Sequence, residues 1–252
     1  MTMERKFGWK RQLPDYKDYQ LSLSEAEVTN LPQSADLRPG CPPVYDQLTI
    51  GSCTGNAWAG IDEFVKMKQK QAYFTPSRLF IYYNERLLEG TVKTDSGAEL
   101  RDGIKTLIKQ GVCPETEWPY NVKKFAKKPC KKCYRDALKN EVIQYLAVTQ
   151  IENQLKGCLA AGYPYVFGFT VYSSFMADQV AQTGIMPMPG ANDSVLGGHA
   201  VMAAGYSDAD KWYIIRNSWG ENWGDKGYFY MPYDYMHNNN LCADFWTIRS
   251  VE

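Results

Sequence analysis

The chain has 252 residues, of which 44% are hydrophobic, and its 28 basic residues balance 28 acidic ones. This length and composition predict a globular protein with a sizeable core, in one large domain or two packed lobes. Balanced charge argues against a nucleic-acid partner, and no apolar run approaches the roughly 20 residues of a membrane helix. The first residues lack the apolar stretch of a signal peptide, which favours an intracellular over a secreted protein.

Four segments carry the periodicity of amphipathic helices. Apolar residues at positions 57, 61, 64 and 65 share one face of the first segment, and positions 100, 104, 107 and 108 share one face of the third. Glycines, lysines and a Thr-Pro pair stand near the ends of these segments, as is typical of helix boundaries. Helices are predicted over 53–70, 75–90, 97–111 and 152–162.

The second half of the chain is typical of strands. Its short segments are rich in aromatic and β-branched residues and are separated by Gly, Asp and Asn. Helices followed by strands predict an α+β protein with a helical lobe and an antiparallel sheet lobe, and a cleft between such lobes is a natural place for a site. Strands are predicted over 165–172, 199–206, 211–219, 227–233 and 244–251.

Seven cysteines are an odd number, so at least one thiol is free or pairs between molecules. Cys130 and Cys133 form a C-x-x-C inside the lysine-rich segment 123–134. A solvated basic loop is the favoured interpretation of this segment, and a local disulfide or a metal site stays open. Because zinc would need two more ligands and the chain has two histidines, we assign no metal and no cofactor.

Cys53 stands at the start of the first predicted helix, where the positive end of the helix dipole stabilises a thiolate. A nucleophilic thiol needs a base, and only His199 and His237 are available. His199 opens an apolar strand after two glycines, whereas His237 lies in a polar turn typical of the surface. Asn217 follows a predicted strand and can orient the ring of His199, while Trp219 can shield their hydrogen bond from water.

These motifs resemble the papain family of cysteine peptidases. The resemblance rests on DQLTIGSCTGNAW around the cysteine, GGHAVMAAGY around the histidine and RNSWGENWGDKGYFYM around the asparagine. Two further stretches, LPQSADLRP and GVCPETEWPY, match in order, so the resemblance runs from Leu31 to the C-terminus. It implies a papain-like peptidase domain over 31–252, with a helical lobe mainly at 45–145, an antiparallel β-barrel-like lobe mainly at 146–252, and an active-site cleft between them.

The resemblance also implies roles for single residues. Cys53 would attack the peptide carbonyl and form a thioester, and His199 would act as the base and then as the acid. Asn217 would orient the histidine, with Trp219 shielding it. Gln47 would donate its side-chain amide to the oxyanion, together with the backbone N–H of Cys53.

By the same resemblance, Gly97, Ala98 and Gly198 would bind the backbone of a peptide substrate. Gly198 and Gly168 would leave space for a bulky apolar side chain two residues before the scissile bond, while Glu99 would favour a basic one. The implied partners are protein or peptide substrates of a monomeric hydrolase, and we expect an endopeptidase made as a zymogen.

Two positions depart from the usual family pattern. The family's cysteine three residues before the nucleophile is replaced by Ile50, and the aromatic residue after it by Thr54. These departures favour the prokaryotic or large-DNA-virus branch over lysosomal cathepsins. The absence of an apolar stretch near the N-terminus favours an intracellular or virion-packaged enzyme over a secreted one. Two alternatives stay open, a papain-fold acyl transferase or amidase and a catalytically inactive binding module.

Residues 1–30 precede the resemblance and form a short N-terminal arm. Pro14 limits helix formation, so 13–20 is expected to be extended or turned. We consider two hypotheses, a short propeptide lying over the cleft and a permanent arm packed elsewhere. In either case the large apolar side chains of the arm are expected to be buried, namely Phe7, Trp9, Leu13, Tyr16 and Tyr19.

Overall fold

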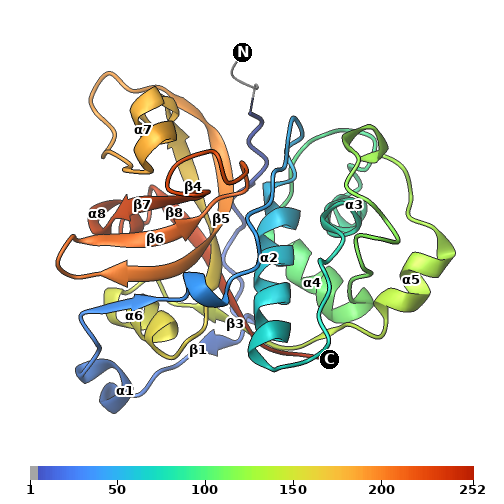
Figure 1. The fold of residues 1–252 in the computed structure, drawn as a ribbon, viewed down its shortest axis with the longest axis horizontal. Coiled ribbons are helices and arrows are strands. Elements are labelled where there is room, and N and C mark those ends of the chain that lie inside the picture. The colour runs from blue at the N-terminus through green and yellow to red at the C-terminus, as the bar shows by residue number, and fades with distance from the viewer. Residues whose placement is uncertain (1–4) are drawn as a thin grey trace.

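The computed structural model describes residues 5–252. Figure 1 shows helices on one side, a large sheet on the other, and the N-terminal segment passing between α2 and the strands. The helices on the first side are α2 (Cys53–Lys68), α3 (Arg78–Leu88), α4 (Leu100–Gln110) and α5 (Lys131–Ala137). Shorter helices accompany the sheet, namely α1 (Glu25–Thr29), α6 (Glu152–Ala160), α7 (Asp178–Thr183) and α8 (Tyr233–Met236).

The sheet has eight strands in the order β1-β3-β8-β4-β5-β6-β7, with β2 paired to β5. All neighbours are antiparallel except β1 and β3, which run parallel. The path is open, so the sheet lobe is not a closed barrel. The strands are β1 (Gln20–Leu21), β2 (Ser34–Asp36), β3 (Val142–Val148), β4 (Tyr165–Tyr172), β5 (Val195–Ser207), β6 (Trp212–Arg216), β7 (Tyr228–Pro232) and β8 (Cys242–Val251).

Helix α2 joins the two sides of the molecule. It packs against α3 and α4 on one side and against β5 and β8 on the other, and every residue from Cys53 to Lys66 is buried. Gly60 allows a close approach, because a Cβ there would lie 2.8 Å from Nη1 of Arg216 on β6. The buried charge of Lys66 is compensated by Asp62 one turn earlier, at 2.8 Å.

The predicted α+β class and the predicted helices and strands are confirmed, with small shifts at their ends. Strand β3 and helix α5 were missed, since β3 lacks strict alternation of buried residues and α5 lies in the lysine-rich segment. Within residues 5–252, each helix is too short or too polar to cross a bilayer.

The N-terminal arm divides into two parts. Residues 5–12 lie between the lobes, a turn follows at 16–18, and residues 20–29 form β1 and α1 against the sheet lobe. Trp9 is buried, as expected, and Phe7 is partly buried. The expected burial was wrong for the three apolar residues around the turn, where the chain bends outward, and their exposed fractions are 82% for Leu13, 93% for Tyr16 and 71% for Tyr19.

Gly103 tests the packing of the helical side. Replacing a glycine inside an exposed helix by alanine usually increases the stability of the protein by about 1 kcal/mol. At Gly103 in α4, however, a Cβ would lie 2.2 Å from Nε1 of Trp58, whose indole N–H donates to the carbonyl of Leu100. Gly103→Ala should therefore lower the free energy of unfolding by about 1–3 kcal/mol, measured by urea denaturation.

Gly157→Ala in α6 is the matched control for this change. Its added Cβ would meet Cδ1 of Leu23 at 2.5 Å, but that atom is the flexible end of a side chain. We expect a smaller loss of stability than for Gly103→Ala. If Gly103→Ala proves as stable as the wild type, the close packing inferred around Trp58 is wrong.

Candidate active site

Cys53 is the first residue of α2, and its side chain is fully buried. Two backbone amides from distant segments face its thiol, that of Ala200 on β5 and that of Gly8 in the N-terminal arm. Because Ala200 is the neighbour of His199, the packing of α2 on β5 brings the predicted cysteine and histidine into one site.

The ring of His199 is fixed by three side chains. Its Nε2 lies 2.8 Å from Oδ1 of Asn217, so the Nε2–H donates and Nδ1 is left as the acceptor. Nδ1 is buried and has no hydrogen-bond partner among the described residues. Trp219 lies over the ring, with centroids 5.1 Å apart and planes at 30°, and Phe169 approaches edge-on. The arrangement holds one tautomer and excludes water from the His–Asn hydrogen bond.

Burial keeps both central groups neutral in this state. It raises the pKa of the Cys53 thiol to about 11, even though the amides of Ala200 and Gly8 favour the thiolate. Burial also lowers the pKa of His199 to about 4, against the opposing effect of Asn217. The sequence predicted a thiol pKa lowered by the helix N-terminus. In the covered site desolvation outweighs that effect.

Gln47 lies at the same site and is completely buried. Its Oε1 accepts from the Ser218 hydroxyl at 2.7 Å, which fixes the amide so that Nε2 points away from that hydroxyl. Nε2 donates to the carbonyls of Ile50 and Lys6, both at 3.0 Å. The amide predicted to bind an oxyanion therefore already binds a carbonyl oxygen of the arm.

Asp95, which no sequence pattern singles out, fixes the loop before the nucleophile. Its carboxylate accepts from the amide of Gly51 at 3.0 Å and from the hydroxyl of Tyr82 at 2.7 Å. Lys6 of the arm also pairs with it, at 3.1 Å. A single aspartate in a polar loop has no distinguishing spacing, so only the fold reveals this contact.

The arm passes through the cleft as an extended strand. Its Gly8 carbonyl accepts from the amide of Ala98 at 2.7 Å, and the amide of Trp9 donates to the carbonyl of Gly198 at 2.9 Å. Gly8 fits because a Cβ there would lie 1.7 Å from the carbonyl oxygen of Gly51, and a Cβ on Gly97 would meet the Gly8 carbonyl at 2.1 Å. The three residues predicted to bind a substrate backbone thus contact the backbone of the arm.

Trp9 fills the side-chain pocket beyond these contacts. Its indole lies over Gly168 and Gly198, where any Cβ would overlap the ring. The indole N–H donates to Oδ2 of Asp244 at 2.9 Å. The carboxylate at this pocket is therefore Asp244, whereas Glu99, for which that role was expected, precedes α4 as its N-cap residue.

Asp244 is in an unusual state. Its φ of 63° is left-handed, at the point where the pairing of β8 with β4 shifts register. Burial raises the pKa of Asp244 to about 6, opposed by hydrogen bonds from the amide of Gln12 and the indole of Trp9. Such a carboxylate is ionised at neutral pH and becomes protonated under mild acidity.

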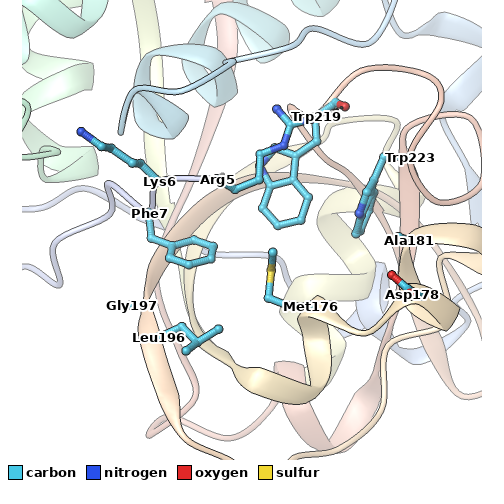
Figure 2. Close-up of a pocket in the computed structure, with 10 residues that line it drawn as sticks. All are labelled: Arg5, Lys6, Phe7, Met176, Asp178, Ala181, Leu196, Gly197, Trp219 and Trp223. Carbon is cyan, nitrogen blue, oxygen red and sulfur yellow. Dashed lines mark hydrogen bonds between the residues drawn. The ribbon is translucent and has the colours of Figure 1, made fainter. Parts of the chain in front are cut away.

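A cavity of about 830 Å³ lies on the other side of the arm, as Figure 2 shows. Trp219 and Trp223 form one wall, and the guanidinium of Arg5 stacks on Trp219 while pairing with Asp46 at 2.6 Å. The remaining lining residues are Lys6, Phe7, Met176, Asp178, Ala181, Leu196 and Gly197. His237 lies elsewhere, with its Nε2 3.0 Å from the hydroxyl of Tyr213.

Comparison with known proteins identifies the family. The sequence profile described as papain family cysteine protease matches residues 31–244. An uncharacterized peptidase C1-like protein of Acanthamoeba polyphaga mimivirus is 40% identical, and the match covers 99% of this chain and 88% of that protein.

Solved structures agree with this result. Xylellain, a cysteine protease from Xylella fastidiosa, is 45% identical with a TM-score of 0.92, and the match covers 98% of this chain and 96% of that one. The proCathepsin B S9 of Trypanosoma congolense shares the fold, with a TM-score of 0.77 at 18% identity, covering 98% of this chain and 86% of that one. A viral and a bacterial relative are consistent with the branch that Ile50 and Thr54 predicted.

Proposed function

The chain belongs to the papain family of cysteine proteases, and we propose that it is an endopeptidase held latent by its own N-terminal arm. The observation that carries this proposal is the backbone N–H of Gly8 facing the Cys53 thiol. A peptide bond can be cleaved only where its carbonyl carbon faces the sulfur, so the arm covers the nucleophile without being a substrate for it.

In the uncovered enzyme, Cys53 loses its proton to Nδ1 of His199, and its sulfur attacks the peptide carbonyl. The C–N bond breaks, the amine leaves with the proton from His199, and a thioester stays on Cys53. His199 then takes a proton from water, the hydroxide attacks the thioester, and the C–S bond breaks to release the acid, while His199 returns the proton to the sulfur. Gln47 Nε2 and the Cys53 amide stabilise the oxyanion in both steps, and Asn217 keeps the Nδ1 lone pair directed at the sulfur.

These roles predict distinct kinetic effects. Cys53→Ala should abolish peptide hydrolysis, and Gln47→Ala should lower kcat by about 100–1000-fold because an oxyanion donor acts mainly in the transition state. Asn217→Ala should lower kcat more than it raises KM. In the active chain kcat/KM should be bell-shaped in pH, since the coupled thiol and imidazole must share one proton.

The control for these variants is His237→Ala, which removes the second histidine away from the site. Its kcat/KM should stay close to that of the wild type. Hydrolysis that persists in Cys53→Ala, or a pH profile that rises without a maximum, would contradict the proposed roles.

Open space on both sides of Cys53 supports cleavage within a chain. The 830 Å³ cavity beside Trp219 lies on one side. On the other side the arm continues past Trp9 to a second cavity of about 520 Å³ near Asp244. Substrate residues can therefore extend in both directions from the scissile bond, as an endopeptidase requires.

Chain direction supports latency. By resemblance to the family, Gly97, Ala98 and Gly198 bind the part of a substrate that precedes the scissile bond. A substrate therefore approaches Cys53 from that side in the N-to-C direction. The arm runs the other way, from Lys6 at Gln47 past Gly8 at the thiol to Trp9 in the pocket, and its bridge to Ala98 is parallel. In this reversed direction the arm presents the amide N–H of Gly8 to the thiol.

The exposed turn around Tyr16 is the place where a protease could free the arm. Cleavage there would release the residues in the cleft and leave β1 and α1 packed on the sheet lobe. A chain beginning at Lys17 should therefore fold and hydrolyse a small peptide substrate at least about 10-fold faster than the full chain. Truncating a buried tryptophan usually costs several kcal/mol of packing free energy. Trp9→Ala in the full chain should therefore weaken the binding of the arm to the cleft and raise the peptidase activity.

Tyr16→Ala is the matched control, since it also removes an aromatic side chain of the arm but one that is exposed. It should leave the full chain latent. The decisive measurement is the initial rate with a peptide substrate, together with the rate at which Cys53 is alkylated. Equal rates for the full chain and the chain beginning at Lys17 would show that the arm is structural.

The Trp9 pocket indicates the preferred substrates. It accepts a large flat side chain between two glycines, and Asp244 offers an acceptor to a donor at the far end. We therefore expect bulky residues two before the scissile bond, and basic or indole-bearing ones above all.

Asp244→Asn tests this preference. The variant keeps an oxygen acceptor and tolerates the left-handed backbone but loses the charge. It should reduce the preference for arginine over leucine at that substrate position by about 10-fold or more, since a hydrogen bond to a charged group is worth about 1.5–3 kcal/mol. In the wild type the preference should grow as pH rises through about 6 and Asp244 ionises. A preference for small or acidic residues in a peptide library would refute the assignment.

A further inference from the structure

Three thiols that take no part in the proposed catalysis converge on the helical side of the molecule. Cys113 and Glu117 lie in the segment after α4, and Cys133 lies on α5. The two sulfurs and one carboxylate oxygen of Glu117 are all within 4.8 Å of one another. The third thiol, Cys130, precedes α5, and its sulfur is 2.9 Å from that of Cys133.

Glu117 supplies a second, independent observation. Its Oε1 pairs with Lys132, while Oε2 is buried and has no hydrogen-bond partner among the described residues. A buried carboxylate oxygen without a partner is costly, because it has lost water and gained nothing in return. Two buried sulfurs lie within 4.8 Å of an oxygen of this carboxylate, and none of the described cationic groups pairs with Oε2.

We propose that Cys113, Cys130, Cys133 and Glu117 bind one zinc ion. Three thiolates and a carboxylate form the soft, four-ligand set that Zn²⁺ takes in structural sites. Sulfur ligands of one tetrahedral zinc lie about 3.8 Å apart. The sulfurs of Cys130 and Cys133, 2.9 Å apart, would therefore separate as the ion binds, and the Cys130 side chain would turn toward Cys113 and Glu117. Lys132 would keep Glu117 Oε1 and so orient its Oε2 toward the ion.

The surroundings supply donors and positive charge for a thiolate site. The amide of Cys133 donates to the Cys130 sulfur at 3.4 Å. Three thiolates and a carboxylate leave two negative charges after zinc binds, which nearby lysines can offset. These lysines are Lys123, Lys124, Lys127, Lys128, Lys131 and Lys132.

A disulfide explains the cluster less well. Cys133 contacts both Cys130 and Cys113. Joining either pair would leave the third thiol and the Glu117 oxygen without a role. Zinc would satisfy all four groups and tie α5 to the segment after α4, on the helical side where Ile50 replaces the cysteine usual in the family. The proposal does not depend on the peptidase assignment.

The test measures metal in the full-length chain. After expression with added zinc and dialysis, elemental analysis should find one zinc per chain. Substituting cobalt should give the intense thiolate-to-metal absorption of a sulfur-rich tetrahedral site. Cys130→Ser should bind zinc at least about 100-fold more weakly, because even losing an outer hydrogen bond to a ligand costs about 10–100-fold. Cys130 is exposed, so this variant should still fold, and Glu117→Gln should also weaken binding.

Two controls separate this site from other thiols. Cys41→Ser removes a partly buried thiol outside the cluster, and Cys53→Ala removes the thiol of the cleft. Both should keep one zinc and the cobalt spectrum. Three results would overturn the proposal: no zinc retained by the wild type, zinc lost in Cys53→Ala but kept in Cys130→Ser, or a Cys130–Cys133 disulfide in protein whose thiols were blocked at lysis.

Discussion

The packing of α2 against β5 is the constraint on which the whole site depends. It sets Cys53, at the start of the helix, beside the amide of Ala200 and hence beside His199. The fit needs Gly60, where the helix meets Arg216, and that arginine donates to the carbonyl of Pro43 and stacks on the ring of Tyr45. The groups of the site thus come from both sides of one tightly packed interface, and their geometry is as rigid as that interface.

The N-terminal arm binds in this rigid site as a short segment and not as a separate domain. Eight residues, from 5 to 12, contact the groups that are proposed to bind a substrate: the Gln47 amide, the backbone of Ala98 and Gly198, and the pocket that ends at Asp244. Covering the site also changes its electrostatics, because removing water favours the neutral thiol and the neutral imidazole. In the proposed latent state the arm would therefore block access to the thiol and at the same time disfavour the ion pair on which nucleophilic attack depends.

Sequence patterns predicted what local chemistry and order along the chain determine. The sequence patterns predicted the helix that begins at Cys53, the strand that begins near His199 and the spacing of Gln47 to the cysteine. The fold brings these residues together. The positions of Asp95 and Asp244 in the site could not be predicted, because each is a single acidic residue whose contacts are made with segments far away in the sequence. Asp244 moreover depends on a register shift between β4 and β8, which no periodicity encodes.

The two positions considered for the N-terminal arm, over the cleft and packed elsewhere, are each occupied by a different part of the described segment. Residues 20–29 add β1 to the edge of the sheet and set α1 against α6, so they belong to the sheet lobe. Residues 5–12 lie in the cleft and are held by contacts to both lobes, including the backbone amide of Arg101 of α4, which donates to Oε1 of Gln12 at 2.9 Å. The exposed turn between them separates the two parts. Because residues 20–29 are anchored on the sheet, the local concentration of the cleft-binding residues stays high. A short extended strand can therefore remain bound in the cleft, where a free peptide of the same length would dissociate.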